Sequence, residues 1–145
     1  MAAAPLRLSF GDKLMDATDR IAEAFDRLVR LGRDGVSKRP ASERIIYYVV
    51  ATRCEIDIDG FSSVYEQHLN PAEIGTLIDG LNQIGEKDLA DEFCRGFELL
   101  KRDGYYEHMN WNNVSNAAKS EIELIGTRVG DRLWALDDKL ATLLD

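Results

Sequence analysis

The middle of the chain carries acidic side chains at the spacing of a calcium-binding loop. Acids at positions 1, 3, 5 and 12 and a glycine at position 6 match such a loop; they are Glu55, Asp57, Asp59, Glu66 and Gly60. Position 1 is normally Asp, position 8 is Ser62 where a branched apolar residue is usual, and no second loop of this kind occurs. We therefore predict no metal site and no cofactor, and interpret the match as a chance arrangement at a helix boundary, with a calcium loop as the alternative.

The remaining residues give little material for catalysis. His68 and His108 are the only histidines, and the sequence contains no GxSxG, HExxH or phosphate-binding glycine loop. Cys54 and Cys94 lie in apolar helical patterns, which predicts buried, reduced thiols rather than a disulfide or a zinc site. We expect a protein that is not an enzyme; an enzyme that uses either histidine with nearby carboxylates is the alternative.

The negative charge of the chain is concentrated in its middle third. The net charge of the whole chain is −8, whereas residues 54–98 hold 11 acids against Lys87 and Arg95, a net charge of −9. Such a segment repels nucleic acid and attracts basic surfaces. We therefore predict no direct binding of nucleic acid and a partner with a basic protein surface. The acids that we expect to form the binding face are Asp57, Asp59, Glu66, Glu73, Asp79, Glu86, Asp88, Asp91 and Glu92.

Helices are expected to position these acids. Apolar residues at helical spacing predict a helix over residues 10–31, followed by a loop over 32–40. Ser42 is an N-cap candidate for a second helix, although its run from Ile45 to Val50 is β-branched and aromatic. Gly60 should end this helix, and a short amphipathic helix should follow at Phe61.

Further helix boundaries are marked by capping residues and glycines. Asn70-Pro71-Ala72-Glu73 predicts a helix start, and Gly85 its end. A fifth helix follows from Leu89 to near Gly104, then a polar loop over 105–113 and a long last helix.

The last helix carries two further patterns. Leucines and Val129 recur three and four residues apart up to Leu143, which fits packing inside the domain or, as the alternative, the seam of a homodimer. Gly126 and Gly130 lie four residues apart and predict a close helix–helix crossing.

These elements predict an all-α fold, a compact bundle of about six helices with a long C-terminal helix. With 145 residues, the chain fits a single domain over 1–145. No stretch reaches the roughly 20 apolar residues that span a membrane, and the first residues lack the apolar core of a signal peptide. We therefore expect a cytoplasmic protein that does not enter a membrane.

Part of the chain resembles a known family. The residues that carry the resemblance are Glu55, Gly60-Phe61, Tyr65, Asn70, Leu77, Leu81, Ile84-Gly85 and Leu89-Ala90. In this pattern the chain resembles a family of small helical bacterial domains of unknown function named for a DNA-mimic protein. The family usually has Gly where this chain has Asp59, and often Gln and Asn where it has Ser63 and Gln67. The family-like core spans about residues 42–104.

The resemblance implies an all-α domain and, for the naming member, an acidic surface that imitates DNA and occupies a DNA-binding protein. The motif residues Glu55, Gly60, Phe61 and Gly85 are expected to be structural, because glycine permits a tight turn and an aromatic side chain fills a core. We therefore expect an acidic binding module of the DNA-mimic kind. The alternative is an immunity or antitoxin-type inhibitor of a toxin or nuclease.

Overall fold

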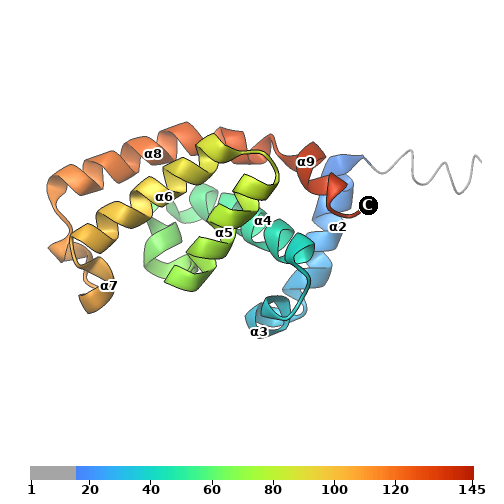
Figure 1. Ribbon diagram of the computed structural model, residues 1–145, viewed down its shortest axis with the longest axis horizontal. Helices are drawn as coiled ribbons and strands as arrows, with labels where there is room; N and C mark the ends of the chain where they lie inside the picture. Colours follow the sequence, from blue (N-terminus) through green and yellow to red (C-terminus); the bar gives the residue numbers. More distant parts are fainter. Residues whose placement is uncertain (1–15) are drawn as a thin grey trace, which may run out of the picture. The chain divides into compact units, whose positions relative to one another are not determined.

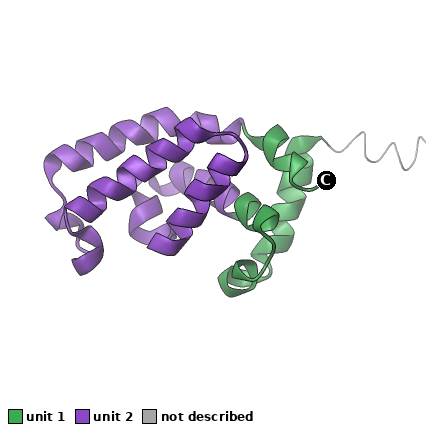
Figure 2. Ribbon diagram, viewed as in Figure 1, with its two compact units in different colours: residues 1–47, 136–145 green, residues 48–135 purple. Residues whose placement is uncertain are grey.

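A computed structural model describes residues 16–145, in which every regular element is a helix and no strand occurs (Figure 1). The all-α prediction is confirmed. The chain divides into two compact units (Figure 2). The described part of unit 1 comprises residues 16–47 and 136–145, and unit 2 comprises residues 48–135. The prediction of a single domain over 1–145 stays a prediction.

Unit 1 contains the two ends of the described chain. It is built from α2 (Ala17–Val29), α3 (Gly32–Ser37), the first residues of α4 (Ala41–Asp59) and α9 (Asp137–Thr142). Helix α2 is the described part of the predicted 10–31 helix, and it buries Ile21, Ala24 and Leu28 on one face. Residues 10–15 of that prediction lie outside the described residues. Helix α9 packs against α2, and Arg20 forms an ion pair with Asp145 at 2.8 Å.

The predicted loop over 32–40 is wrong for its first six residues, which form α3. Gly32 has a φ of +74°, a left-handed conformation that allows the chain to turn after α2 and start again as a helix. Val36 is fully buried, and the Ser37 hydroxyl donates a hydrogen bond to the Asp34 carbonyl. Burial of Val36 and this local hydrogen bond stabilise a helix that the glycines and charged residues of the segment did not predict.

Unit 2 contains the longer helices and all nine acids of the predicted binding face. After α4 come the π-helical turn η1 (Val64–His68), α5 (Pro71–Gln83), α6 (Lys87–Arg102), the single turns α7 (Tyr105–His108) and η2 (Trp111–Asn113), and α8 (Asn116–Trp134). Helix α6 packs against both α5 and α8 (Figure 1). Its buried face includes Leu89, Phe93 and Leu100, and α8 contributes Ile122, Ile125 and Leu133 to the core.

Capping residues and glycines in the sequence predicted most helix boundaries correctly. At the start of α5, Asn70 and Glu73 form a reciprocal capping box, with Pro71 as the first helical residue. Gly60, Gly85 and Gly104 have φ values of +92°, +81° and +73° and follow α4, α5 and α6. Helix α4 forms despite its β-branched run, because Ile45, Ile46, Val49 and Val50 are all buried and tertiary packing outweighs the small propensity differences.

The C-terminal part of the chain is more broken than predicted. The expected loop over 105–113 contains α7 and η2, because Tyr105 is buried and packs edge-on against Trp111. The expected long last helix is divided at Ala135 and Leu136 into α8 and α9. The heptad-like leucines are therefore shared between two helices and two units. Val129, Leu133, Leu136 and Leu140 are buried within the chain, which leaves them unavailable as a dimer seam, and a homodimer stays a prediction.

The two glycines of α8 have different environments. A Cβ atom at Gly126 would lie 2.6 Å from Cβ of Phe61, so the Phe61 side chain rests directly on the helix backbone there. A Cβ atom at Gly130 would meet nothing within 4 Å. The predicted close crossing therefore reduces to one contact, between a glycine and an aromatic side chain, and Gly130 takes no part in it.

Replacement of Gly126 by alanine should destabilise the protein by about 1–3 kcal/mol, because the new methyl group overlaps Phe61. Gly130→Ala is the matched control on the same helix. It should stabilise by about 0.4–1 kcal/mol, because alanine restricts the unfolded chain and meets no neighbour. Urea unfolding of both variants measures the difference, and equal effects would contradict the proposed contact.

Candidate protein-binding surface

The acids at the end of α4 lie on a helix rather than in a loop. Glu55, Asp57 and Asp59 all belong to its last turns, and no basic residue occupies its last turn. At about 100° per residue, Glu55 and Asp59 lie on one side of the helix and Asp57 points about 160° away from both, so the three carboxylates do not converge on one point. The described residues contain no group of three or more His, Cys, Asp or Glu side chains that could hold a metal ion. Residues 55–59 are thus part of helix α4, whereas the alternative of a calcium loop requires them to be a loop.

Glu55 and Asp59 form a carboxyl pair one helical turn apart. The hydrogen bond between them raises the pKa of Asp59 above its ordinary value of 3.8, and slight desolvation and the charge of Glu55 raise it further. The Ser63 hydroxyl donates a hydrogen bond to Glu55. Glu55, expected to be structural, thus ties the end of α4 to the turn that follows Gly60, whereas Asp57 is exposed beside it.

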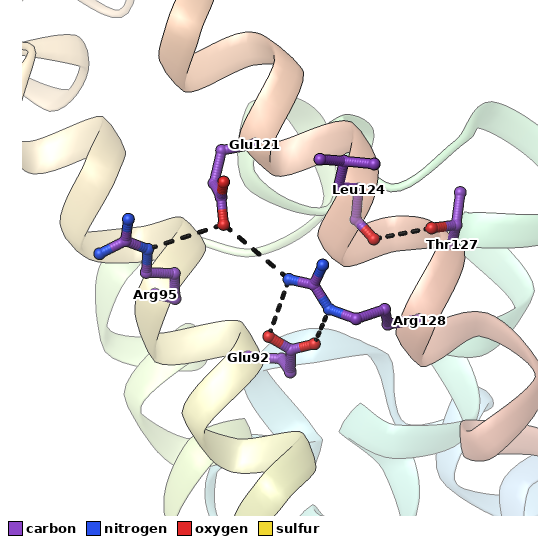
Figure 3. Close-up of polar contacts among 6 residues, drawn as sticks. All are labelled: Glu92, Arg95, Glu121, Leu124, Thr127 and Arg128. Carbon is purple, nitrogen blue, oxygen red and sulfur yellow. Dashed lines mark hydrogen bonds and ion pairs between the residues drawn. The ribbon is translucent and has the colours of Figure 1, made fainter.

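Four of the nine predicted face acids have partners inside unit 2. Glu92 accepts two hydrogen bonds from Arg128, which links α6 to α8 (Figure 3). Glu121 lies 3.9 Å from both Arg128 and Arg95 in the same network (Figure 3). Glu86 pairs with Arg132 at 3.7 Å. Glu92 and Glu86 are largely covered, with 20% and 15% of their side chains exposed, so they hold the helices together rather than face a partner.

The other two partnered acids act locally. Glu73 accepts a hydrogen bond from the Asn70 backbone N–H at 3.0 Å and a second one from the Tyr48 hydroxyl at 3.4 Å. Asp91 pairs with Lys87 at 3.0 Å, one turn away on α6. Glu73 caps the start of α5. The Lys87–Asp91 pair on α6 is exposed and contributes little to stability.

The remaining acids are the ones that can meet a partner. Asp57 on α4, Asp79 on α5 and Asp88 on α6 are exposed and form no ion pair with any described residue. Asp59 is also exposed and has a hydrogen bond with Glu55, and Glu66 is half-buried in η1. Eight of the nine predicted residues therefore lie on α4, η1, α5 and α6, and Glu86 is the residue just before α6. Some of these carboxylates are paired within unit 2, and others are not.

Unit 2 contains a cleft that the sequence did not predict. It has a volume of about 510 Å³. Its lining combines apolar, small and polar side chains from the end of α4, the turn after it, η2 and α8: Ile56, Phe61, Trp111, Ile122, Gly60, Gly126, Ser62, Lys119, Glu123 and Thr127. Trp111 belongs to the segment 105–113, which the sequence predicted to be a polar loop. No local signal tells that residues 56–62 and 119–127 meet, because the contact depends on tertiary packing.

One cation lines this cleft. The Lys119 ammonium lies 5.7 Å from the centre of the Trp111 ring, within the range of a cation–π contact. Neither Lys119 nor Glu123, one turn further along α8, forms an ion pair with a described residue. The lining thus combines apolar side chains with one cation and one anion, neither of which forms an ion pair with a described residue.

The histidines and cysteines do not form a common site. His68 is half-buried in η1, whereas His108 is exposed at the end of α7. Cys54 and Cys94 are free thiols and half-buried rather than fully buried, and burial raises the pKa of the Cys54 thiol.

Among residues 16–145, no helix has both the length and the apolar character needed to cross a membrane. Comparisons of this chain with protein-family models, with curated proteins and with solved structures found no match.

The Glu55–Asp59 pair predicts a specific pH dependence. Because the pKa of Asp59 is raised in the folded state, the stabilisation from its protonated form is present below its ordinary pKa and is lost as the pH rises through the raised value. Asp59→Asn should therefore increase stability relative to the unmodified protein at pH 7 and not at pH 3.

Denaturant unfolding at both pH values measures this effect, and an NMR titration of the Asp59 carboxyl group measures its cause. Asp57→Asn removes the same charge from the same helix end without the bond to Glu55. An equal gain for Asp57→Asn, or a gain for Asp59→Asn that does not change with pH, would contradict the role of the pair.

Proposed function

We propose that this chain is a non-enzymatic binding module that engages a basic protein surface through the unpaired acids of unit 2. The proposal extends to a DNA-binding protein as the partner, with the acidic surface in the place of the nucleic-acid backbone. The observation that carries it is the difference between Glu86 and Glu92, which arginines of α8 neutralise, and Asp57, Asp79 and Asp88, which are exposed without such a partner.

Electrostatics supports this kind of binding. Residues 54–98 carry a net charge of −9, and their two bases, Lys87 and Arg95, are engaged with Asp91 and Glu121. A field of this sign raises the rate at which a basic protein arrives and disfavours contact with nucleic acid. Its range is limited, since the Debye length falls from about 10 Å at 0.1 M salt to about 3 Å at 1 M.

The alternative is an immunity or antitoxin-type inhibitor of a toxin or nuclease. The cleft around Trp111 favours it, because an apolar hollow recognises the shape of one partner, whereas an array of charges accepts many basic surfaces. The two functions differ in their response to DNA. Duplex DNA competes with a DNA mimic for its partner, and it leaves untouched an inhibitor that binds elsewhere on its target.

The test is affinity capture on the immobilised protein from an extract of its source cells. Capture at about 0.1 M salt should be lost at about 1 M salt, because the exposed charges are then screened. The triple variant Asp57→Asn, Asp79→Asn, Asp88→Asn should capture at least tenfold less partner at low salt. Elution by duplex DNA at constant ionic strength supports the mimic, and retention supports the inhibitor.

The control for this variant makes the same change in net charge elsewhere. Glu107, Asp131 and Asp138 are exposed acids outside residues 54–98. Their replacement by Gln, Asn and Asn should leave capture unchanged. If the control variant loses as much partner as the test variant, or if capture survives high salt, the local acidic surface is not the binding site.

A further inference from the structure

The cleft of unit 2 combines an apolar lining with acids in and beside it. Phe61, Trp111 and Ile122 belong to the apolar part of the lining. Glu123 is the acid of the lining, on α8. Ile56 and Gly60 also line the cleft, and they are the sequence neighbours of Asp57 and Asp59, so the acidic end of α4 adjoins it.

The apolar surface continues outside the cleft along α8. Leu124 follows Glu123 in the chain and is 54% exposed. It lies one turn before Thr127, whose hydroxyl donates a hydrogen bond to the Leu124 carbonyl at 2.7 Å (Figure 3). A small molecule held in the cleft would leave Leu124 in water. A protein segment can cover both the cleft and the leucine beside it, and aromatic side chains such as Trp111 are typical anchors of such contacts.

The charges in and beside the cleft indicate which segment fits. Glu123 forms no ion pair with a described residue, and Lys119 lies over the face of Trp111. The end of α4, which adjoins the cleft, has no base in its last turn. An apolar side chain that enters the cleft beside these acids is therefore best flanked by cations, and a flanking acid would be repelled.

We propose that this cleft receives an apolar side chain of the partner protein that is flanked by lysine or arginine. This proposal rests on the proposed function, since it assigns to the basic partner one anchoring contact in addition to its attraction by Asp57, Asp79 and Asp88. The acids outside the cleft bring the partner to the surface, and the cleft selects it by shape.

Trp111 provides a spectroscopic test. The chain has two tryptophans, and Trp134→Phe leaves Trp111 as the only one while keeping an aromatic ring beside Arg53. In this background, the probe is a blocked peptide with one leucine between two pairs of lysines. Titration should shift the Trp111 emission to a plateau. The same peptide with serine in place of leucine should bind at least tenfold more weakly, because it has no apolar side chain to bury.

Two substitutions on one wall of the cleft should have opposite effects. Glu123→Gln removes an attractive charge and should weaken binding of the leucine peptide about two- to fivefold, the scale of one exposed charge pair. Lys119→Gln removes a repulsive charge and should strengthen it by a similar factor. Both residues lie on α8 one turn apart and are changed to an uncharged side chain of similar length, so each controls for the other.

A third substitution blocks the cleft. Thr127→Phe places an aromatic ring in it from an exposed position of α8 and should abolish the emission shift, whereas Ala117→Phe, on an exposed position outside the lining, should not. Circular dichroism checks that both variants fold.

The outcomes separate the two proposals. Equal binding of the leucine and serine peptides, no plateau at all, or full binding by Thr127→Phe would overturn the cleft proposal. In each of these cases, salt-sensitive capture of the partner that depends on Asp57, Asp79 and Asp88 would leave the proposed function standing. Loss of that dependence removes the proposed function itself.

Discussion

The contact between Phe61 and Gly126 determines the arrangement of the part of unit 2 that we propose to be functional. The Phe61 ring lies on the backbone of α8, and its centroid is 5.5 Å from that of Tyr65 and 5.4 Å from that of Phe93. One side chain therefore joins the turn after α4, η1, α6 and α8. Gly60 permits that turn through its positive φ. Gly60 and Gly126 both line the cleft. Phe61 can lie this close to α8 because Gly126 has no side chain, and both residues line the cleft.

The acidic character of unit 2 is shaped by a second constraint, the pairing of α6 with α8. Arg128 and Arg132 project from α8 toward Glu92 and Glu86, and Arg95 meets Glu121 from the other side. Arg128 and Arg132 follow residue 98, so they do not enter the net charge of residues 54–98, yet they neutralise two of its acids in space. An interaction surface is defined by the carboxylates that remain unpaired, because charges compensated at short range contribute little beyond a Debye length.

The end of α4 is electrostatically unfavourable in a way that function can explain. Glu55, Asp57 and Asp59 lie at the negative end of the helix macrodipole, without a base in the last turn. Hydrogen bonds from Ser63 to Glu55 and between Glu55 and Asp59 relieve part of the repulsion. A cation supplied by a partner would relieve more of this repulsion. The end of α4 therefore fits the proposed binding of basic segments.

The sequence by itself determined the helical class and the helix ends marked by residues with one dominant local role: the capping box at Asn70 and Glu73, and the glycines 60, 85 and 104. These signals act over one turn, so they can be read without the fold. The structure decided that α3 forms, that the last helix breaks at Leu136, and which acids are paired. It also decided that Ile56, Trp111 and Glu123 share a cleft. These features depend on contacts between residues up to some seventy positions apart, and periodicity along one helix carries no information about its neighbour.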